Sequence, residues 1–128
     1  MILDTSAVLA ILFREAEADA FVDLISDADL VGIAAPTLVE TGVVLGNKFG
    51  FGTPLLPQFL QEARVAIIPF GEPHWQTAIS AYERYGKGRH PAKLNLGDCF
   101  SYAAAKLSTY PLLCKGNDFQ QKDVKLAY

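Results

Sequence analysis

Four carboxylates in this sequence stand just past short apolar runs or near the start of helical stretches: Asp4, Glu40, Asp98 and Asp118. Each has large apolar neighbours, and a charged group in such surroundings is costly unless it is hydrogen-bonded, paired or bound to a metal. Carboxylates that cluster repel one another, and a hard cation normally holds them together. We therefore expect these acids to form a site for a divalent cation, Mg²⁺ or Mn²⁺.

Other metal chemistry and histidine catalysis find little support in the sequence. His74 and His90 do not have the spacing of a zinc site, and Cys99 and Cys114 are too isolated for a thiolate centre. No histidine is placed to work with the acids, which argues against catalysis by a histidine general acid and base. The two cysteines lie in apolar stretches, so we expect them to be buried free thiols.

Three of the acids also have a purely structural explanation. Thr37 and Glu40 have the spacing of a capping box at the start of a helix, and so do Asn95 and Asp98. Asp4 could serve only as the N-cap of the helix that follows it. The helix dipole favours a carboxylate near a helix N-terminus whatever its function. The residues alone leave both explanations open.

Short apolar runs alternate with amphipathic stretches along the chain. We expect strands at Ile2–Leu3, Leu30–Ala34, Val65–Ile68 and Leu112–Cys114. We expect helices at Ala7–Phe13, Glu15–Ser26, Thr37–Lys48, Pro54–Ala63, Glu72–Tyr85, Leu96–Ser108 and Asn117–Lys122. This alternation is typical of an α/β fold, a parallel sheet with helices on both faces. Because ligands bind beyond the carboxyl ends of such strands, the acids should meet at that edge.

Length and charge indicate one acidic domain. The chain has 128 residues, 51% of them hydrophobic, and a net charge of −3, so we expect a single domain over residues 1–128. No apolar run reaches the roughly 18 residues of a membrane span, and the N-terminus lacks a signal-peptide pattern, so we expect a cytoplasmic protein. Net acidity argues against binding of nucleic acid by bulk charge. Local phosphate contacts are an alternative to solvated surface for Arg14, Lys87, Arg89, His90, Lys93 and Lys115.

Two apolar groups lie outside the acid positions. Trp75, Ile79 and Tyr82 share one face of a predicted helix, and we assign them to the core. Phe49 and Phe51 flank a glycine-rich turn and are expected to be exposed. An exposed apolar surface there would suit contact with a partner or a second copy of the chain.

Four segments, taken together and in order, resemble a known family. They are M-I-L-D-T-S-A at the start, T-L-V-E, L-N-L-G-D-C-F-S-Y-A and L-L-C-K-G-N-D-F. The chain resembles the PIN domain, and more closely the VapC-type toxins of bacterial toxin–antitoxin pairs, from Met1 to about Asp123. The resemblance implies a single PIN-like domain with a five-stranded parallel sheet and the activity of a metal-dependent endoribonuclease.

The resemblance also implies roles for individual residues. Asp4, Glu40 and Asp98 match the three acids that hold the metal in the family. Thr5 or Ser6 matches the hydroxyl group that supports a metal-bound water. The implied reaction is attack of that water on phosphorus, which leaves a 5′-phosphate and a 3′-hydroxyl.

This chain departs from the family pattern at the fourth acid. The family often has an acid where the neutral Asn117 stands here, and Asp118 follows it. Asp118 is therefore the candidate fourth catalytic acid, with Asn117 in a supporting role. The partners that the resemblance implies are an RNA substrate, a second copy of the chain in a homodimer, and a VapB-type antitoxin whose C-terminal segment lies across the active site.

Other small α/β proteins fit less well. A dinucleotide-binding domain needs a glycine-rich turn after its first strand, and D-T-S-A has none. A phosphatase of the haloacid type needs an aspartate where Ser6 stands, and a response-regulator receiver needs one after its third strand, where Pro69 follows. Two alternatives stay open: a PIN nuclease of RNA maturation, and an acidic α/β module that binds without catalysis.

Overall fold

The computed structural model describes residues 1–86, 88, 93–119 and 123–128 of the chain. Its strands are β1 (Ile2–Leu3), β2 (Gly32–Ala34), β3 (Ala66–Ile68) and β4 (Leu112–Leu113). Its helices are α1 (Thr5–Leu12), α2 (Ala18–Asp27), α3 (Ala35–Phe49), α4 (Leu55–Glu62), α5 (Glu72–Tyr85) and α6 (Leu96–Ser108). Across these described ranges, no helix is both long enough and apolar enough to cross a membrane.

The strands form one parallel sheet in the order β3-β2-β1-β4. The predicted α/β class is therefore confirmed, whereas the prediction of five strands is wrong for the described part of the chain. In the described residues, the C-terminal segment joins β4 through an isolated bridge between Leu112 and Leu126. The Leu112 N–H donates to the Lys125 carbonyl at 2.8 Å, and the Ala127 N–H donates to the Leu112 carbonyl at 2.9 Å.

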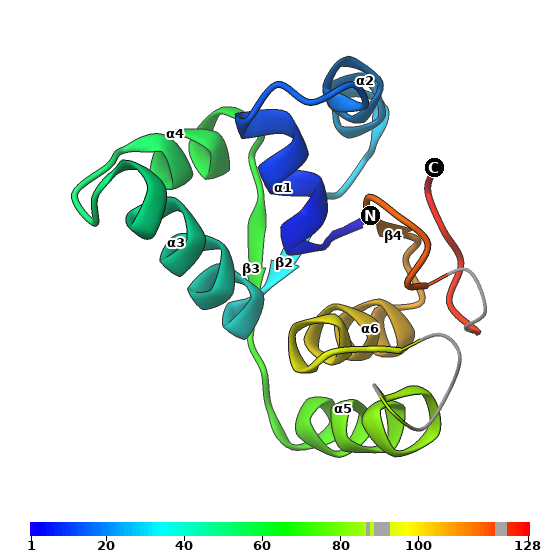
Figure 1. The fold of residues 1–128 in the computed structure, drawn as a ribbon. Coiled ribbons are helices and arrows are strands. Elements are labelled where there is room, and N and C mark those ends of the chain that lie inside the picture. Colours follow the sequence, from blue (N-terminus) through cyan, green and yellow to red (C-terminus); the bar gives the residue numbers. More distant parts are fainter. Residues whose placement is uncertain (87, 89–92, 120–122) are drawn as a thin grey trace.

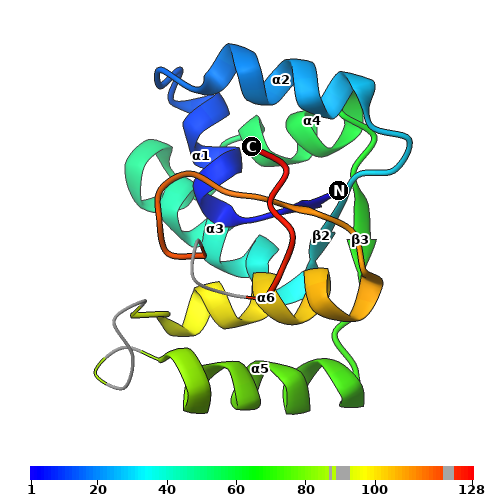
Figure 2. The same cartoon turned by 90° about the vertical axis from the view of Figure 1, so that its right-hand side faces the viewer.

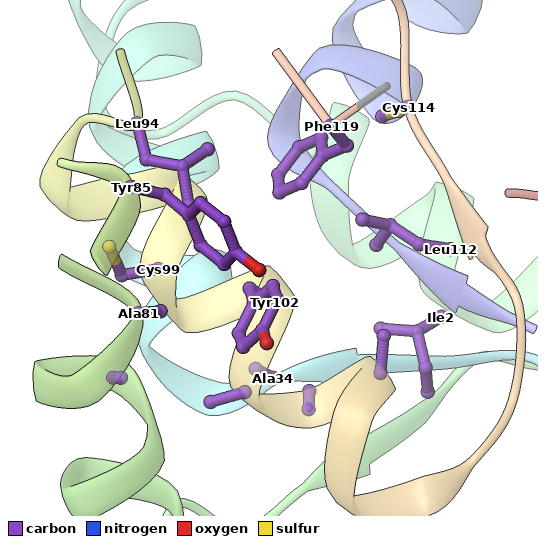
Figure 3. Packing of buried hydrophobic residues seen from close by; sticks show 14 residues of the cluster. Ile2, Ala34, Ala81, Tyr85, Leu94, Cys99, Tyr102, Leu112, Cys114 and Phe119 are labelled. Atoms are coloured by element: carbon purple, nitrogen blue, oxygen red, sulfur yellow. The ribbon is translucent and has the colours of Figure 1, made fainter. Parts of the chain in front are cut away.

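Strands β1 and β4 contribute to two cores, because successive side chains point to opposite faces of a sheet. Ile2 and Leu112 belong to the core shared with α5 and α6, whereas Leu3 and Leu113 pack on the other side with α1, α2 and α4. Figures 1 and 2 show α5 and α6 together on one side of the strands and the other helices across from them. Figure 3 shows the first core, with Phe119 beside Leu112.

Four helices begin at residues other than those predicted: α1 and α3 begin earlier, and α2 and α4 begin later. Helix α1 begins at Thr5, directly after Asp4, and α3 begins at Ala35 with Pro36 in its first turn. Proline suits that turn, because the N–H that it lacks has no partner within the helix there. Helix α3 ends at Phe49, one residue beyond the predicted end, and its C-cap is Gly50, where φ is 94°.

The predicted short helix at 117–122 is not seen in its described half. Residues 117–119 form a bend and a turn, and residues 120–122 lie outside the described part of the chain. Cys99 and Cys114 are buried free thiols, as predicted. Phe49 and Phe51 are exposed, also as predicted.

The assignment of Trp75, Ile79 and Tyr82 to the core is wrong. Their side chains are 49%, 60% and 39% exposed. Helix α5 packs on α6 through its other face, which carries the buried residues Ala78, Ala81 and Tyr85. Small alanines allow α6 to come close on that side. The larger apolar face is left as one wall of a groove of about 580 Å³, lined also by Phe70, Leu96 and Phe100.

Candidate active site

Asp4 lies where β1 ends and α1 begins, and both of its carboxylate oxygens accept hydrogen bonds. It is the N-cap of α1, and Oδ2 accepts from the Ser6 N–H at 3.1 Å and from the Ser6 hydroxyl at 2.6 Å. The Ser101 hydroxyl, which comes from α6, donates to Oδ1 at 2.6 Å. Asp4 therefore caps a helix and is also a buried carboxylate that distant parts of the chain hold in one orientation.

Glu40 lies in the second turn of α3, and its carboxylate is held by α1. The predicted capping box with Thr37 is wrong, because α3 begins at Ala35 and its N-cap is Ala34. The Thr5 hydroxyl donates to Glu40 Oε1 at 2.6 Å and lies 3.0 Å from the Thr41 hydroxyl. Helix capping therefore does not explain Glu40, whose carboxylate interacts across helices.

Asp98 lies in the first turn of α6, where the predicted capping box is confirmed. The Asp98 N–H donates to Asn95 Oδ1 at 2.8 Å, and the Asn95 N–H donates to Asp98 Oδ2 at 3.0 Å. Burial raises the pKa of Asp98 to about 7; the hydrogen bond from Asn95 opposes this rise, and the charges of Asp4, Asp118 and Glu40 add to it. The four acids thus lie close enough together for their charges to repel.

Asp118 and Asn117 lie in the turn that follows β4, and both are exposed. The next residue, Phe119, is buried and fixes this turn against the core. Burial raises the pKa of the Cys114 thiol to about 12, and the charges of Asp4, Asp98 and Asp118 contribute. Cys114 is therefore a neutral thiol beside the acids, and Asp118 acts on the site through its charge.

Sequence reasoning missed a set of buried hydroxyl groups around the acids. Ser101 and Thr41 are fully buried, and the Ser101 hydroxyl lies 3.5 Å from that of Thr37. Thr41 donates to the Thr37 carbonyl at 2.8 Å. The sequence does offer one signal for Ser101, because it follows Asp98 by three residues and so lies on the same side of α6.

The ligand atoms that the acids supply are of the chemical type that a divalent cation prefers. The acids supply carboxylate oxygens, which hard cations prefer, and a cation would relieve the repulsion that contributes to the raised pKa of Asp98. As they stand in the described residues, no three His, Cys, Asp or Glu side chains are gathered tightly enough to hold a metal ion. Hydrogen bonds from Ser6, Ser101 and Thr5 hold the carboxylates in their present positions.

Few of the basic residues singled out in the sequence can be placed at the site. The Lys115 N–H donates to the Ser6 hydroxyl at 2.9 Å, while its ammonium lies 2.8 Å from Glu15 and 3.4 Å from Glu17. Arg14 and Lys93 are exposed. Lys87, Arg89 and His90 lie outside the described residues, so their predicted contact with phosphate stays a prediction.

The one histidine in the described part of the chain has a structural role. His74 lies in the first turn of α5, and its Nδ1 accepts from the Gly71 N–H at 3.1 Å. Its ring centroid lies 5.2 Å from that of Phe70.

Comparison with known proteins gives a consistent result. The family model of the PIN domain matches residues 1–125. The chain is 42% identical over 125 residues to a protein named Ribonuclease VapC from Mycolicibacterium smegmatis, and the match covers 97% of each chain.

Solved structures show a similar fold. The VapC20 toxin of Mycobacterium tuberculosis, described as cleaving the sarcin–ricin loop, matches with a TM-score of 0.73 and 16% identity over 96% of this chain and 95% of that one. A toxin–antitoxin complex from Klebsiella pneumoniae matches with a TM-score of 0.72 and 18% identity over 99% of this chain and 97% of that one. At these identities the likeness concerns the fold.

Proposed function

The chain belongs to the PIN domain family, and we propose that it is an endoribonuclease of the VapC type that acts as the toxin of a toxin–antitoxin pair. The observation that carries the proposal is the approach of Asp4, Glu40 and Asp98 at the carboxyl edge of the sheet, which contributes to the raised pKa of Asp98. We propose that these three acids hold Mg²⁺ or Mn²⁺, with Asp118 as a fourth catalytic acid and Asn117 beside it.

The chemistry divides between a cation and the side chains of the chain. When bound, a divalent cation lowers the pKa of a water molecule and neutralises charge that develops on a phosphodiester. The chain orients the carboxylates: Ser6 and Ser101 hold Asp4, and Thr5 holds Glu40. Since the pKa of Asp98 is about 7, binding of a cation at neutral pH should release a proton from this group.

A toxin is favoured over a nuclease of RNA maturation. The relative that is 42% identical over 97% of both lengths is named Ribonuclease VapC. We also propose a VapB-type antitoxin as partner, a homodimer as the assembly and the cytoplasm as the place of action. The similar fold in a toxin–antitoxin complex supports the partner. Co-purification with the product of a small neighbouring gene, followed by sedimentation, tests partner and assembly together.

The experiment that tests the nuclease is sequencing of RNA 5′ ends after brief expression of the chain. We expect new ends at a limited set of positions with the parent. Asp4→Asn should fold, because an amide oxygen can still accept the capping bond from Ser6, and it should produce almost none of these ends. The same new ends in both proteins would show that Asp4 is not part of the nuclease site, whereas no new ends in either protein would favour a binding module.

A further inference from the structure

Gly97 lies one residue before Asp98, and the carboxylate of Glu40 fills the space beside its Cα. A Cβ added at Gly97 would lie 2.6 Å from Glu40 Cδ and 2.7 Å from Oε1, and closer still to Oε2. Cβ atoms do not approach other heavy atoms this closely. Gly97 is itself buried, so the approach takes place inside the site.

Conformational freedom does not explain this glycine. Gly97 lies in the first turn of α6, and it is not among the glycines with positive φ, which are Gly50, Gly88 and Gly116. Alanine would fit its backbone and is the better helix former. The requirement for glycine therefore comes from the neighbouring carboxylate.

Two different contacts thus hold the Glu40 carboxylate in place, one with Thr5 and one with Gly97. On one side the Thr5 hydroxyl donates to Oε1 at 2.6 Å. On the other side the bare Cα of Gly97 lets the carboxylate reach the N-terminal turn of α6, where the positive end of the helix dipole favours a negative charge. The same turn carries Asp98, so this contact sets the distance between the two acids.

We propose that Gly97 is a positioning residue, whose missing side chain lets the Glu40 carboxylate lie beside the turn that carries Asp98, so that both acids can approach one divalent cation. The proposal rests on the proposed metal-dependent function. It predicts that Gly97→Ala leaves the fold intact and displaces Glu40, because the group that must move is the end of a flexible side chain. A glycine needed only for folding would give the opposite result, with stability lost first.

The test compares Gly97→Ala with the parent in three measurements. We expect the melting temperature to stay within about 4 °C of the parent. The higher helix propensity of alanine should offset the contacts that Glu40 loses when its side chain moves. We expect RNA cleavage to fall about 100-fold in kcat, the size of effect that a displacement of about 1 Å produces. Affinity for Mn²⁺, measured by titration calorimetry without RNA, should fall about 10-fold or more.

Gly42→Ala is the matched control. Gly42 lies in α3, two residues from Glu40, and a Cβ there would meet Leu56 Cδ2 at 3.7 Å, an ordinary contact. This variant should match the parent in cleavage and in Mn²⁺ affinity. A second comparison uses Glu40→Ala as background: with the carboxylate gone, adding Gly97→Ala should change Mn²⁺ affinity no further.

A crystal structure of Gly97→Ala judges the proposal independently of nuclease activity. It should show the Glu40 carboxylate moved out of hydrogen-bond distance of Thr5. A variant that keeps this hydrogen bond, binds Mn²⁺ like the parent, or melts far below it would overturn the role of Gly97. A parent that cuts no RNA would instead refute the proposed function, while the position of Glu40 in the variant would still decide the role of Gly97.

Discussion

The two sides of helix α6 reverse the usual placement of polar and apolar groups. On one side Asp98 and Ser101 face the other acids, and both are buried and hydrogen-bonded. On the other side Leu96 and Phe100 line the groove with α5, where Leu96 is 64% exposed. Hydrophobicity alone would place these groups the other way round.

The two sides of α6 differ in how they affect the stability of the fold. Burial of Asp98 among three other acids raises its pKa, so the metal-free fold is less stable wherever this group is ionised. The groove is an uncovered apolar surface that no described residue fills. The repulsion between buried carboxylates therefore indicates that the acid side is the active site. The groove shows only that α5 and α6 leave apolar surface exposed.

Among variants on the two sides of α6, we expect Asp98→Asn to have the largest effect. Cleavage of RNA should fall at least about 100-fold, because a neutral amide is a poor ligand for a hard cation. The fold should persist, since the amide oxygen can accept the bond from Asn95. The matched control is Asp23→Asn, at an exposed position in α2, and it should cut like the parent. Equal activity in both variants would remove Asp98 from the site.

Ser101→Ala tests the hydroxyl that α6 donates to Asp4. We expect a loss of about 10-fold to 100-fold in Mn²⁺ affinity or cleavage, the usual effect of removing a group that orients a metal ligand. Leaving a buried carboxylate oxygen without this donor should also cost about 1–3 kcal/mol in the free energy of unfolding. Ser80→Ala, on the exposed part of α5, is the control. Parent-like Mn²⁺ affinity in Ser101→Ala would reduce Ser101 to a packing residue.

The free energy of unfolding should depend on pH, because ionisation of the buried Asp98 destabilises the folded state. Its pKa is about 7 when folded and 3.8 as the ordinary value, so the folded state retains a proton over this range that the unfolded state has lost. The contribution of Asp98 to stability is therefore full below about pH 4 and is lost as pH rises through about 7. Denaturant titrations of metal-free parent and Asp98→Asn should diverge over this window, with the variant favoured at pH 8. Parallel curves would contradict the raised pKa.

The smallest effect is expected on the groove side. Ile79→Ala removes a side chain that is 60% exposed, and the free energy of unfolding should change by no more than about 0.5 kcal/mol. Leu94→Ala, at a fully buried leucine of the neighbouring core, should cost about 2–5 kcal/mol. Denaturant unfolding of both variants measures the contrast. A loss above about 1 kcal/mol in Ile79→Ala would show that something covers the groove in solution.

What the sequence predicts correctly depends on local patterns. The alternation of short apolar runs and helices gives the α/β class, and the spacing of Asn95 and Asp98 gives a capping box that forms as expected. The capping box of Thr37 and Glu40 fails because Pro36 is compatible with a first helical turn, so α3 starts two residues earlier.

The features that the sequence did not predict depend on which surfaces meet in space. Helix α5 has one apolar face of small residues and one of large residues, and only the position of α6 decides which is buried. Ser101 and Gly97 gain their importance from Asp4 and Glu40, which lie far away in the chain. No fifth strand forms in the described residues, where β4 has one isolated bridge on that side, between Leu112 and Leu126.

The most direct test of the metal-dependent acidic site is cleavage of a structured RNA by the purified chain, free of any antitoxin, with the cation under control. We predict cleavage in Mg²⁺ or Mn²⁺, its loss on addition of EDTA, and its return when the cation is restored in excess. Product ends should carry a 5′-phosphate. Cleavage that continues at full rate in EDTA would contradict the account, because the carboxylates would then act without the cation that they are proposed to hold.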